Sequence, residues 1–137
     1  MKALSVRQPW ADQIASGEKW LEFRSRPTSH RGRLLICSSR GGERFFIGID
    51  GKEVPLPVGV MLIAVDVVNC RPMVAADKTH PGAPQVIDGC WVWEFDRDTT
   101  DTVIPAPVAG RLGLFDVPDD QIVSAPDDKP CWFNYIQ

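Results

Sequence analysis

The sequence contains no apolar run near the roughly 20 residues that a membrane-spanning helix needs. Met1 and Lys2 lead directly into an alternating segment, which is unlike the charged and then apolar start of a secretory signal peptide. We therefore expect a cytoplasmic protein with no membrane association. The 137 residues, of which 44% are hydrophobic and 24% charged, suit one globular domain over residues 1–137 with a core of its own.

Residues that bind metals are also scarce. There are two histidines, His30 and His80, and the four cysteines lie far apart without a C-x-x-C pair, at Cys37, Cys70, Cys90 and Cys131. A structural zinc site needs about four converging ligands, usually supplied in close pairs. The sequence therefore predicts no metal site and no cofactor, and the cysteines are best interpreted as buried thiols in a reducing compartment.

Several common catalytic signatures are missing. The sequence has no Ser-His-Asp arrangement, Walker loop, dinucleotide-binding glycine pattern or His-Glu-x-x-His motif. Internal repeats, heptads and low-complexity tracts are absent too. If the protein is an enzyme, its acid–base chemistry would rest on Lys19 with Glu22 or with Glu94, because a lysine–carboxylate pair can activate water.

Basic and acidic residues are distributed unevenly along the chain. Residues 1–44 hold nine basic and four acidic side chains, whereas the remaining residues hold six basic and fourteen acidic ones. The net charge of −3 argues against a protein that binds polyanions over its whole surface, but the N-terminal third can attract phosphate locally. The alternative is that both sets of charges are solvated surface.

The first elements follow from alternation and from helix-terminating residues. Residues 2–7 alternate as a short strand, and Gln8-Pro9 then begins a helix, since proline at a helix start loses no intrahelical hydrogen bond. Gly17 suits a left-handed C-cap, so the helix is about two turns long.

Two further strands are predicted before residue 40. Residues 19–26 alternate, which puts Glu22 and Arg24 on one face and Lys19 on the other. Residues 33–39 have a nearly continuous apolar centre, which is typical of a strand covered on both faces.

The remainder of the chain reads as strands separated by long loops. Asp50-Gly51 favours a hairpin turn of type I′ within a glycine- and proline-rich stretch. Strands are predicted at residues 60–70, 90–95 and 111–117, with a loop at residues 97–102. The fold class expected is α+β but mainly β, a small closed β-barrel of six or seven strands with a short helix between the first two.

The last residues are expected to extend this barrel. Residues 117–137 carry two acidic pairs, Asp119-Asp120 and Asp127-Asp128, and end in an aromatic segment, CWFNYI, at residues 131–136. We expect the aromatic side chains to pack on the barrel and the acidic residues to be available to a protein partner.

Several separated motifs fit one family pattern. They are Ser5 with Pro9-Trp10, Gly17 with Lys19, Glu22 and Arg24, Arg31-Gly32, Val58-Gly59-Val60, and the segment GRLGLF at residues 110–115. In this order they resemble the ASCH family, a branch of the PUA-like β-barrels, over most of residues 3–117. The motifs are specific because they recur in the expected sequence along the chain.

The resemblance implies binding of RNA or of a nucleotide. One bacterial branch of the family resembles an amidohydrolase acting on N4-acetylcytidine, and another has been associated with RNA cleavage. In the amidohydrolase branch, a lysine at the position of Lys19 and a threonine at the position of Glu22 take part in catalysis. The lysine matches and the threonine does not. The closer match is to the ASCH module of eukaryotic coactivators and of stand-alone bacterial or phage proteins.

These observations predict a polar cleft for a nucleotide-like ligand. The expected ligand-binding residues are Ser5, Arg7, Gln8, Trp10, Lys19, Glu22, Arg24, Arg31 and Ser38. Arginine and carboxylate groups can contact phosphate and base edges, and Trp10 can stack on a base. For Lys19 the alternative is an ordinary ion pair on the rim of the barrel, and for Glu22 and Arg24 it is a structural pair inside the cleft.

Two functions from different classes are compatible with this cleft. The first is a non-catalytic module that binds RNA or a modified nucleotide. The second is a small hydrolase, an N4-acetylcytidine-type amidohydrolase or a ribonuclease, with Lys19 and Glu22 as its catalytic residues.

Overall fold

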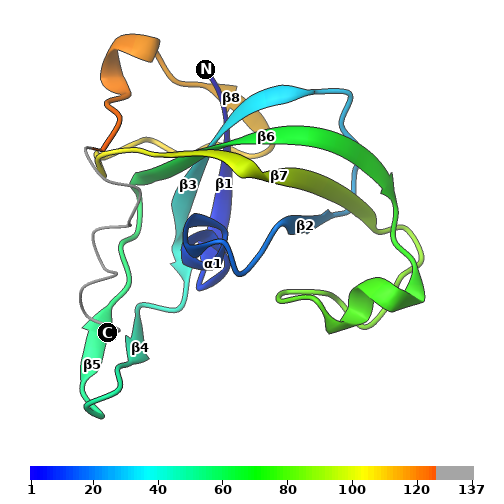
Figure 1. Cartoon of the computed structure of the whole chain (residues 1–137), viewed down its shortest axis with the longest axis horizontal. Coiled ribbons are helices and arrows are strands. Elements are labelled where there is room, and N and C mark those ends of the chain that lie inside the picture. Colours follow the sequence, from blue (N-terminus) through cyan, green and yellow to red (C-terminus); the bar gives the residue numbers. More distant parts are fainter. Residues whose placement is uncertain (126–137) are drawn as a thin grey trace.

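The computed structural model describes residues 1–125 of the chain. A curved six-stranded sheet folds around a short helix, and a two-stranded hairpin projects from it (Figure 1). The strands are β1 (Lys2–Gln8), β2 (Leu21–Arg24), β3 (Gly32–Gly42), β4 (Phe45–Ile47), β5 (Glu53–Pro55), β6 (Met61–Pro72), β7 (Trp91–Thr102) and β8 (Leu114–Asp116). The helix is α1 (Trp10–Ser16), and η1 (Ala75–Thr79) and η2 (Asp119–Gln121) are 3₁₀ turns.

The strand order of the large sheet is β2-β7-β6-β3-β1-β8. β1 runs parallel to β3, and the other neighbours are antiparallel. A parallel pair needs a crossover connection, and here α1 and β2 lie between β1 and β3 in the chain. α1 packs on β1, β3 and β6, so the connection covers one face of the sheet.

The helix has the start and the end that were predicted to within one residue. Pro9 is the residue before its first turn, and Gly17 follows its last turn with a φ of 87°. The N–H of Gly17 donates to the carbonyl oxygen of Ile14 at 3.2 Å, which satisfies one of the carbonyls that a helix end leaves open. This left-handed cap turns the chain back toward β2.

The centre of β3 is covered on both faces, as its apolar run predicted. Leu34 and Ile36 belong to a cluster that includes Ile14 of α1, whereas Leu35 packs in a second cluster with Phe115. Each of the three β3 side chains is fully buried. β3 therefore separates two parts of the core.

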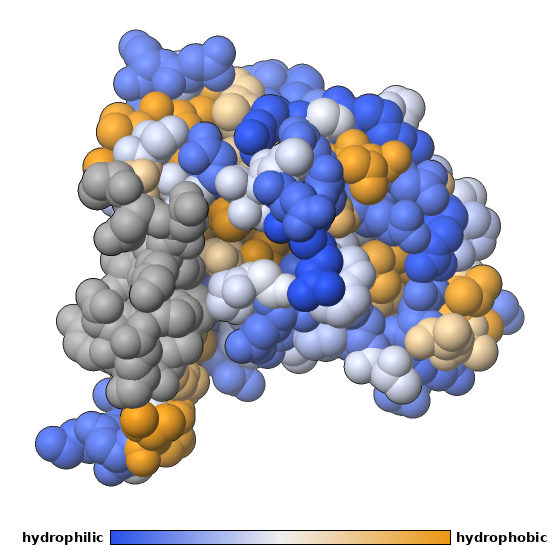
Figure 2. All heavy atoms as spheres, viewed as in Figure 1, coloured by the Kyte–Doolittle hydropathy of each residue, from blue (hydrophilic) through white to orange (hydrophobic). Residues whose placement is uncertain are grey.

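The glycine-rich stretch forms the hairpin of β4 and β5, as expected, but its turn is not of type I′. Such a turn needs a positive φ at both central residues, and Asp50 does not have one, whereas Gly51 has a φ of 79°. Instead, Oδ1 of Asp50 accepts a hydrogen bond from the N–H of Lys52 at 3.0 Å. Figure 2 shows hydrophobic atoms gathered on this projecting hairpin, where Phe45 and Ile47 are exposed.

The loop predicted at residues 97–102 is wrong, because β7 continues to Thr102. The last two residues of this segment pair with β6, with Asp101 opposite Ala64 and Thr102 opposite Ile63. Residues 97–100 are exposed and lie at a register shift, where no β6 residue is opposite them. The polarity of the segment therefore concealed the return of β7 to its pairing with β6.

The fold is mainly β, as expected, but closure into a barrel is not confirmed. β2 and β8 are the two edges of the sheet formed by residues 1–125, and no backbone pairing joins them. The predicted final strand is shortened to β8, so residues 111–113 belong to the preceding loop. A side chain connects β2 to β1 instead: Nη2 of Arg24 donates to the carbonyl oxygen of Ser5 at 2.8 Å.

The first part of the C-terminal extension packs on the sheet. Val117 is buried in the cluster of Leu35, and the N–H of Ala125 donates to the carbonyl oxygen of Thr102 at 2.8 Å. The N-terminal ammonium group of Met1 forms an ion pair of 2.8 Å with Asp119. The second acidic pair and the aromatic end of the chain lie outside the described residues.

Candidate functional site

A cavity of about 630 Å³ lies between β1, β2, β3 and the segment 108–113. We call it the arginine cavity, because its lining includes four arginines and three serines, namely Arg7, Arg24, Arg40, Arg111, Ser5, Ser38 and Ser39. Val108 and Leu112 add apolar surface. Cavities that hold small ligands have volumes of roughly 300–1,000 Å³, so this one is large enough for a nucleotide-sized molecule.

Three of these arginines are unpaired within residues 1–125. Arg7, Arg40 and Arg111 are exposed and form neither a hydrogen bond nor an ion pair there. Arg7 lies over Gly41 and Arg40 over Gly59, where a Cβ atom would be 3.7 Å and 3.2 Å from the nearest guanidinium atom. Like charges around one cavity repel each other unless an anion compensates them.

The fourth arginine, Arg24, is held in place. Its Nε and Nη2 donate to Oε2 of Glu22 at 3.1 Å and 2.9 Å, and Nη2 also donates to the Ser5 carbonyl oxygen. The Arg24 side chain is 30% exposed and that of Glu22 is 8% exposed. A carboxylate that receives two guanidinium N–H groups restricts the rotation of the arginine. Arg24 therefore forms a fixed part of the cavity wall.

Ser5 and Ser38, the two lining serines that the sequence predicted, differ in their hydrogen bonding. Ser5 Oγ is buried and has no partner in residues 1–125, and a Cβ atom at Gly110 would lie only 2.6 Å from it. Ser38 Oγ lies 3.3 Å from both the carbonyl oxygen and the nitrogen of Val60. Because buried hydroxyl groups are usually paired, Ser5 Oγ is the one of the two that lacks an expected hydrogen bond.

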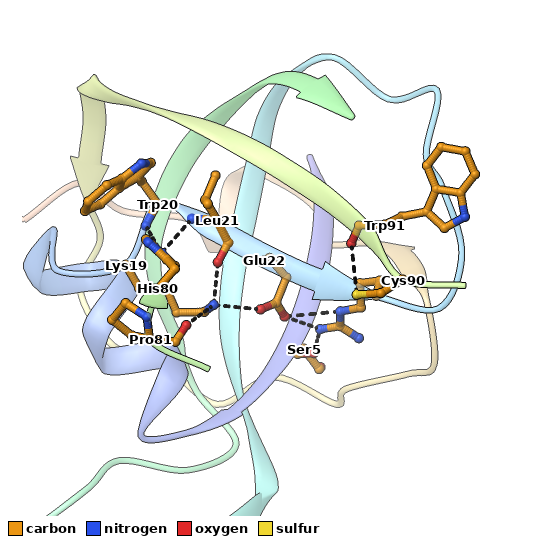
Figure 3. Close-up of polar contacts among 10 residues, drawn as sticks. Ser5, Lys19, Trp20, Leu21, Glu22, His80, Pro81, Cys90 and Trp91 are labelled. Carbon is orange, nitrogen blue, oxygen red and sulfur yellow. Dashed lines mark hydrogen bonds and ion pairs between the residues drawn. The ribbon is translucent and has the colours of Figure 1, made fainter. Parts of the chain in front are cut away.

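Lys19 lies behind Arg24 and Glu22 and is 2% exposed. Its Nζ donates to the carbonyl oxygens of Leu21 and Pro81, the latter at 2.9 Å, and lies 3.5 Å from Oε1 of Glu22 (Figure 3). Burial lowers the pKa of Lys19, the charge of Glu22 opposes this shift, and the charge of Arg24 adds to it. Lys19 does not line the arginine cavity.

The meeting of Lys19 with Glu22 corrects the predicted arrangement of the strand. Alternation over residues 19–26 placed the two side chains on opposite faces. β2 begins only at Leu21, so Lys19 is outside the strand and its side chain can turn toward Glu22. The alternative carboxylate, Glu94, is instead paired with Nε of Arg71 at 2.6 Å.

The segment after η1 covers Lys19. Nε2 of His80 accepts hydrogen bonds of 3.2 Å from the backbone N–H groups of both Trp20 and Leu21. Burial, together with the charges of Lys19 and Arg97, lowers the pKa of His80 to about 4, and the charge of Asp77 opposes this shift. These two hydrogen bonds therefore require a neutral imidazole, because only a deprotonated Nε2 can accept.

The sequence model of the ASCH domain matches residues 4–104. The chain belongs to the ASCH domain family. Activating signal cointegrator 1 of Mus musculus is 30% identical to it over 123 residues, and the match covers 79% of this chain and 21% of the relative. The Homo sapiens protein of the same name is 29% identical over 121 residues, with the same coverage. This ASCH chain thus spans about a fifth of the length of these curated relatives.

Solved structures of an ASCH protein from Zymomonas mobilis have the same fold. The unmodified protein superposes with a TM-score of 0.53, and the match covers 88% of this chain and 89% of that one. A serine-to-alanine mutant of the same protein gives a TM-score of 0.58 with the same coverage. Sequence identity is 13% in both cases, so the similarity supports the fold and no finer property.

Four of the nine expected ligand-binding residues of this ASCH domain line the arginine cavity, namely Ser5, Arg7, Arg24 and Ser38. Lys19 and Glu22 lie directly behind Arg24 and support it. These six side chains therefore form two layers, an outer layer that lines the cavity and an inner layer that is buried behind it.

The other three expected residues lie elsewhere. Gln8 is 2% exposed and exchanges two hydrogen bonds with Asp12, of 2.9 Å and 3.0 Å. Trp10 packs against the core cluster of α1. Arg31 is exposed on a turn, where its guanidinium donates to the carbonyl oxygen of His30 at 2.9 Å. None of these three side chains lines the arginine cavity.

Two cavity arginines were absent from the expected set. Arg40 follows the predicted strand at residues 33–39, and Arg111 belongs to the GRLGLF segment. No local signal marks them, because the Arg40 guanidinium lies over Gly59, which is distant in the sequence, and Gly110 lies against Ser5.

Two other features are absent from residues 1–125, a metal site and a membrane-spanning helix. No three or more His, Cys, Asp and Glu side chains gather there in a way that would hold a metal ion. No helix in the same range is long and apolar enough to cross a membrane. Cys37, Cys70 and Cys90 are free thiols, of which Cys37 is fully buried.

Proposed function

We propose that this ASCH domain binds RNA, or a nucleotide of the kind found in RNA, in the arginine cavity. The observation that carries the proposal is the set of three unpaired arginines beside one cavity, Arg7, Arg40 and Arg111. Guanidinium groups donate two parallel hydrogen bonds to a phosphate, which makes arginine the usual residue for this contact. A bound phosphate group would also relieve the repulsion among the three charges.

The remaining lining groups suit the other parts of a nucleotide. Ser5 Oγ is a buried, unpartnered hydroxyl that could donate to or accept from a sugar or a base edge if Gly110 moved away from it. Val108 and Leu112 offer apolar contact area to the face of a base. Binding of single-stranded RNA combines cationic and apolar contacts of this kind.

We propose that binding occurs without hydrolysis. A catalytic lysine must reach the substrate, whereas Lys19 is 2% exposed and its ammonium group already donates to two carbonyl oxygens. Its contacts with Glu22 are those of a group that supports Arg24. We therefore expect labelled RNA and N4-acetylcytidine to remain unchanged when incubated with the protein.

The experiment compares two double variants that lose the same charge. Arg40→Ala with Arg111→Ala removes two cavity arginines, and Arg26→Ala with Arg31→Ala removes two exposed arginines that do not line the cavity. Binding of a fluorescein-labelled ten-nucleotide oligouridine is measured by anisotropy at several salt concentrations. A phosphate contact in single-stranded RNA contributes about 0.7 to the slope of log K against log salt.

We expect the cavity variant to bind roughly tenfold more weakly or worse and to lose about 1.4 from the salt slope. The control variant should stay near the wild-type values in both respects. Equal effects of the two pairs would show that the RNA is bound by overall charge, and the proposal would then be wrong.

A further inference from the structure

The arginine cavity carries more positive charge than one internal phosphate of an RNA chain can compensate. Its lining, within the part of the chain that the structure describes, includes four arginines but no aspartate or glutamate. Glu22 lies behind the lining and accepts from Arg24, so it compensates at most one of the four charges. The charges of Arg7, Arg40 and Arg111 remain, whereas an internal phosphodiester brings a single negative charge.

This charge is particular to the cavity and does not reflect a shortage of acidic residues. The chain contains 18 aspartates and glutamates against 15 lysines and arginines. Elsewhere such groups pair with each other, as Arg71 does with Asp77 at 2.8 Å and with Glu94 at 2.6 Å. An anion that enters the arginine cavity meets cations and no competing carboxylate among the described lining residues.

Two of the three arginines lie beside the same stretch of backbone. The guanidinium of Arg40 lies over Gly59, where a Cβ atom would be 3.2 Å from the central guanidinium carbon. The carbonyl oxygen of Gly59 accepts a hydrogen bond of 2.9 Å from the N–H of Val108, in the segment that carries Arg111. Because both side chains are exposed, Arg40 and Arg111 can turn toward one anion.

The size of the cavity limits how the compensating charge can be supplied. Its volume of about 630 Å³ suits one small ligand. Three internal phosphates belong to three consecutive nucleotides, each with its own sugar and base, and each phosphate carries one charge. A terminal phosphate monoester instead brings about 1.5 to 2 negative charges and three acceptor oxygens in one group. The monoester therefore supplies more charge in less space.

We propose that the arginine cavity recognises a terminal phosphate monoester, on the end of an RNA chain or on a free nucleotide, in preference to an internal phosphodiester. The inference rests on the proposed function and names the group that this site selects. Arg40 and Arg111 donate to the oxygens of the monoester, since a guanidinium offers two parallel N–H groups to a phosphate. Arg7, which lies over Gly41, the residue after Arg40, adds a third charge nearby.

The test compares pentauridylates that differ only at their ends. Binding to the full chain is measured by isothermal titration calorimetry with RNA that carries no terminal phosphate, a 5′-phosphate or a 3′-phosphate. We expect one phosphorylated RNA to bind roughly tenfold more tightly than the unphosphorylated one, or better. The matched control is that same RNA methylated on its terminal phosphate, which keeps the phosphate group but leaves a diester with one charge. The methyl ester should lose most of the gain.

The source of the monoester is identified with uridine and with the uridine monophosphate that is phosphorylated at the preferred position. We expect the monophosphate to bind roughly tenfold more tightly than uridine. A monophosphate that binds as tightly as the phosphorylated pentauridylate supports a free nucleotide as the ligand, and a weaker one supports an RNA end. Equal binding of the monophosphate and uridine would overturn the inference.

Single substitutions locate the preference in the cavity. Arg40→Ala and Arg111→Ala should each reduce the ratio of the affinities with and without the terminal phosphate severalfold. Arg26→Ala removes an exposed arginine that does not line the cavity and should leave this ratio unchanged. All three side chains are exposed, so we expect each variant to keep the fold.

Three further results would overturn the inference. They are equal binding of the phosphorylated and unphosphorylated pentauridylates, equal binding of the monoester and its methyl ester, and an unchanged affinity ratio in both Arg40→Ala and Arg111→Ala. If the inference alone fails, the double variant of these two arginines still binds unphosphorylated RNA more weakly than the wild type does. If the proposed function fails, that double variant loses no more RNA affinity than the double variant of Arg26 and Arg31.

Discussion

At the scale of single residues, the site consists of three charged side chains that contact one another in series. Lys19 contacts Glu22, Glu22 accepts from Arg24, and Arg24 donates to the Ser5 carbonyl oxygen. A buried pair of charges is tolerated only when its remaining donors and acceptors are also satisfied. Here the carbonyl oxygens of Leu21 and Pro81 satisfy the lysine.

Replacing Lys19 by Met tests this support. The variant keeps an unbranched side chain but removes the ammonium group, so two carbonyl oxygens and Oε1 of Glu22 lose a donor. We expect the free energy of unfolding in urea to fall by about 3 kcal/mol. Lys2→Met, which removes an exposed lysine paired with Asp116, should cost under about 1 kcal/mol. Equal costs would show that Lys19 has no special structural role.

Gly110→Ala tests the approach of the 108–113 segment to Ser5. The added Cβ would lie 2.6 Å from Ser5 Oγ, so either the hydroxyl or the segment must move. Overpacking of this kind costs about 1–3 kcal/mol, and we expect RNA affinity to fall roughly tenfold with the fold retained. Gly41→Ala is the control, because its Cβ would make an ordinary contact of 3.7 Å with Arg7. Similar affinities for both variants would contradict the account.

At the scale of elements, η1 and the residues after it cover Lys19, and His80 and Pro81 hold this segment onto residues 19–21. The neutral Nε2 of His80 accepts from the N–H groups of Trp20 and Leu21. The pKa of His80 falls from 6.5 to about 4 on folding, chiefly through burial. A base whose pKa is lowered in the folded state contributes stability above its ordinary pKa and loses it as pH falls toward the lower value.

Thermal unfolding should therefore show a loss of stability between about pH 7 and pH 4.5 that depends on His80. In His80→Gln an amide oxygen replaces Nε2 as acceptor and does not titrate, so the melting temperature should fall less over this range. Asp12 acts in the opposite direction, because burial raises its pKa and makes acid stabilising, but it is present in both proteins. Parallel pH profiles of the two proteins would show that His80 does not hold this segment.

The bounds of the strands show how far the alternation of apolar and polar residues predicts structure. It located β1, β3 and β6, where apolar side chains enter the core and leave a regular pattern. It failed for the second half of β7, because residues 97–100 are exposed and interrupt the pairing with β6, which resumes at Asp101. It also overextended β2, since Lys19 looks like part of the alternating run but precedes the first paired residue, Leu21.

At the scale of the whole molecule, the arginine cavity is a product of topology. Arg7, Arg40 and Arg111 come from three parts of the chain and meet because β3 and β8 both pair with β1. The motifs of the first 39 residues predicted Arg7 and Arg24, which are close in the sequence because only α1 and most of β2 lie between them. Arg40 and Arg111 could not be assigned in that way, because strand order is set by long-range pairing and leaves no local pattern.

The central claim is that these three unpaired arginines contact phosphate. The most direct measurement is NMR of the arginine Nε–Hε groups during titration with a short single-stranded RNA, with resonances assigned by single substitutions. We predict saturable shifts for Arg7, Arg40 and Arg111 at one common dissociation constant, and no saturable shift for Arg26 or Arg31. Saturable shifts confined to arginines outside the cavity, or none at all, would contradict the account.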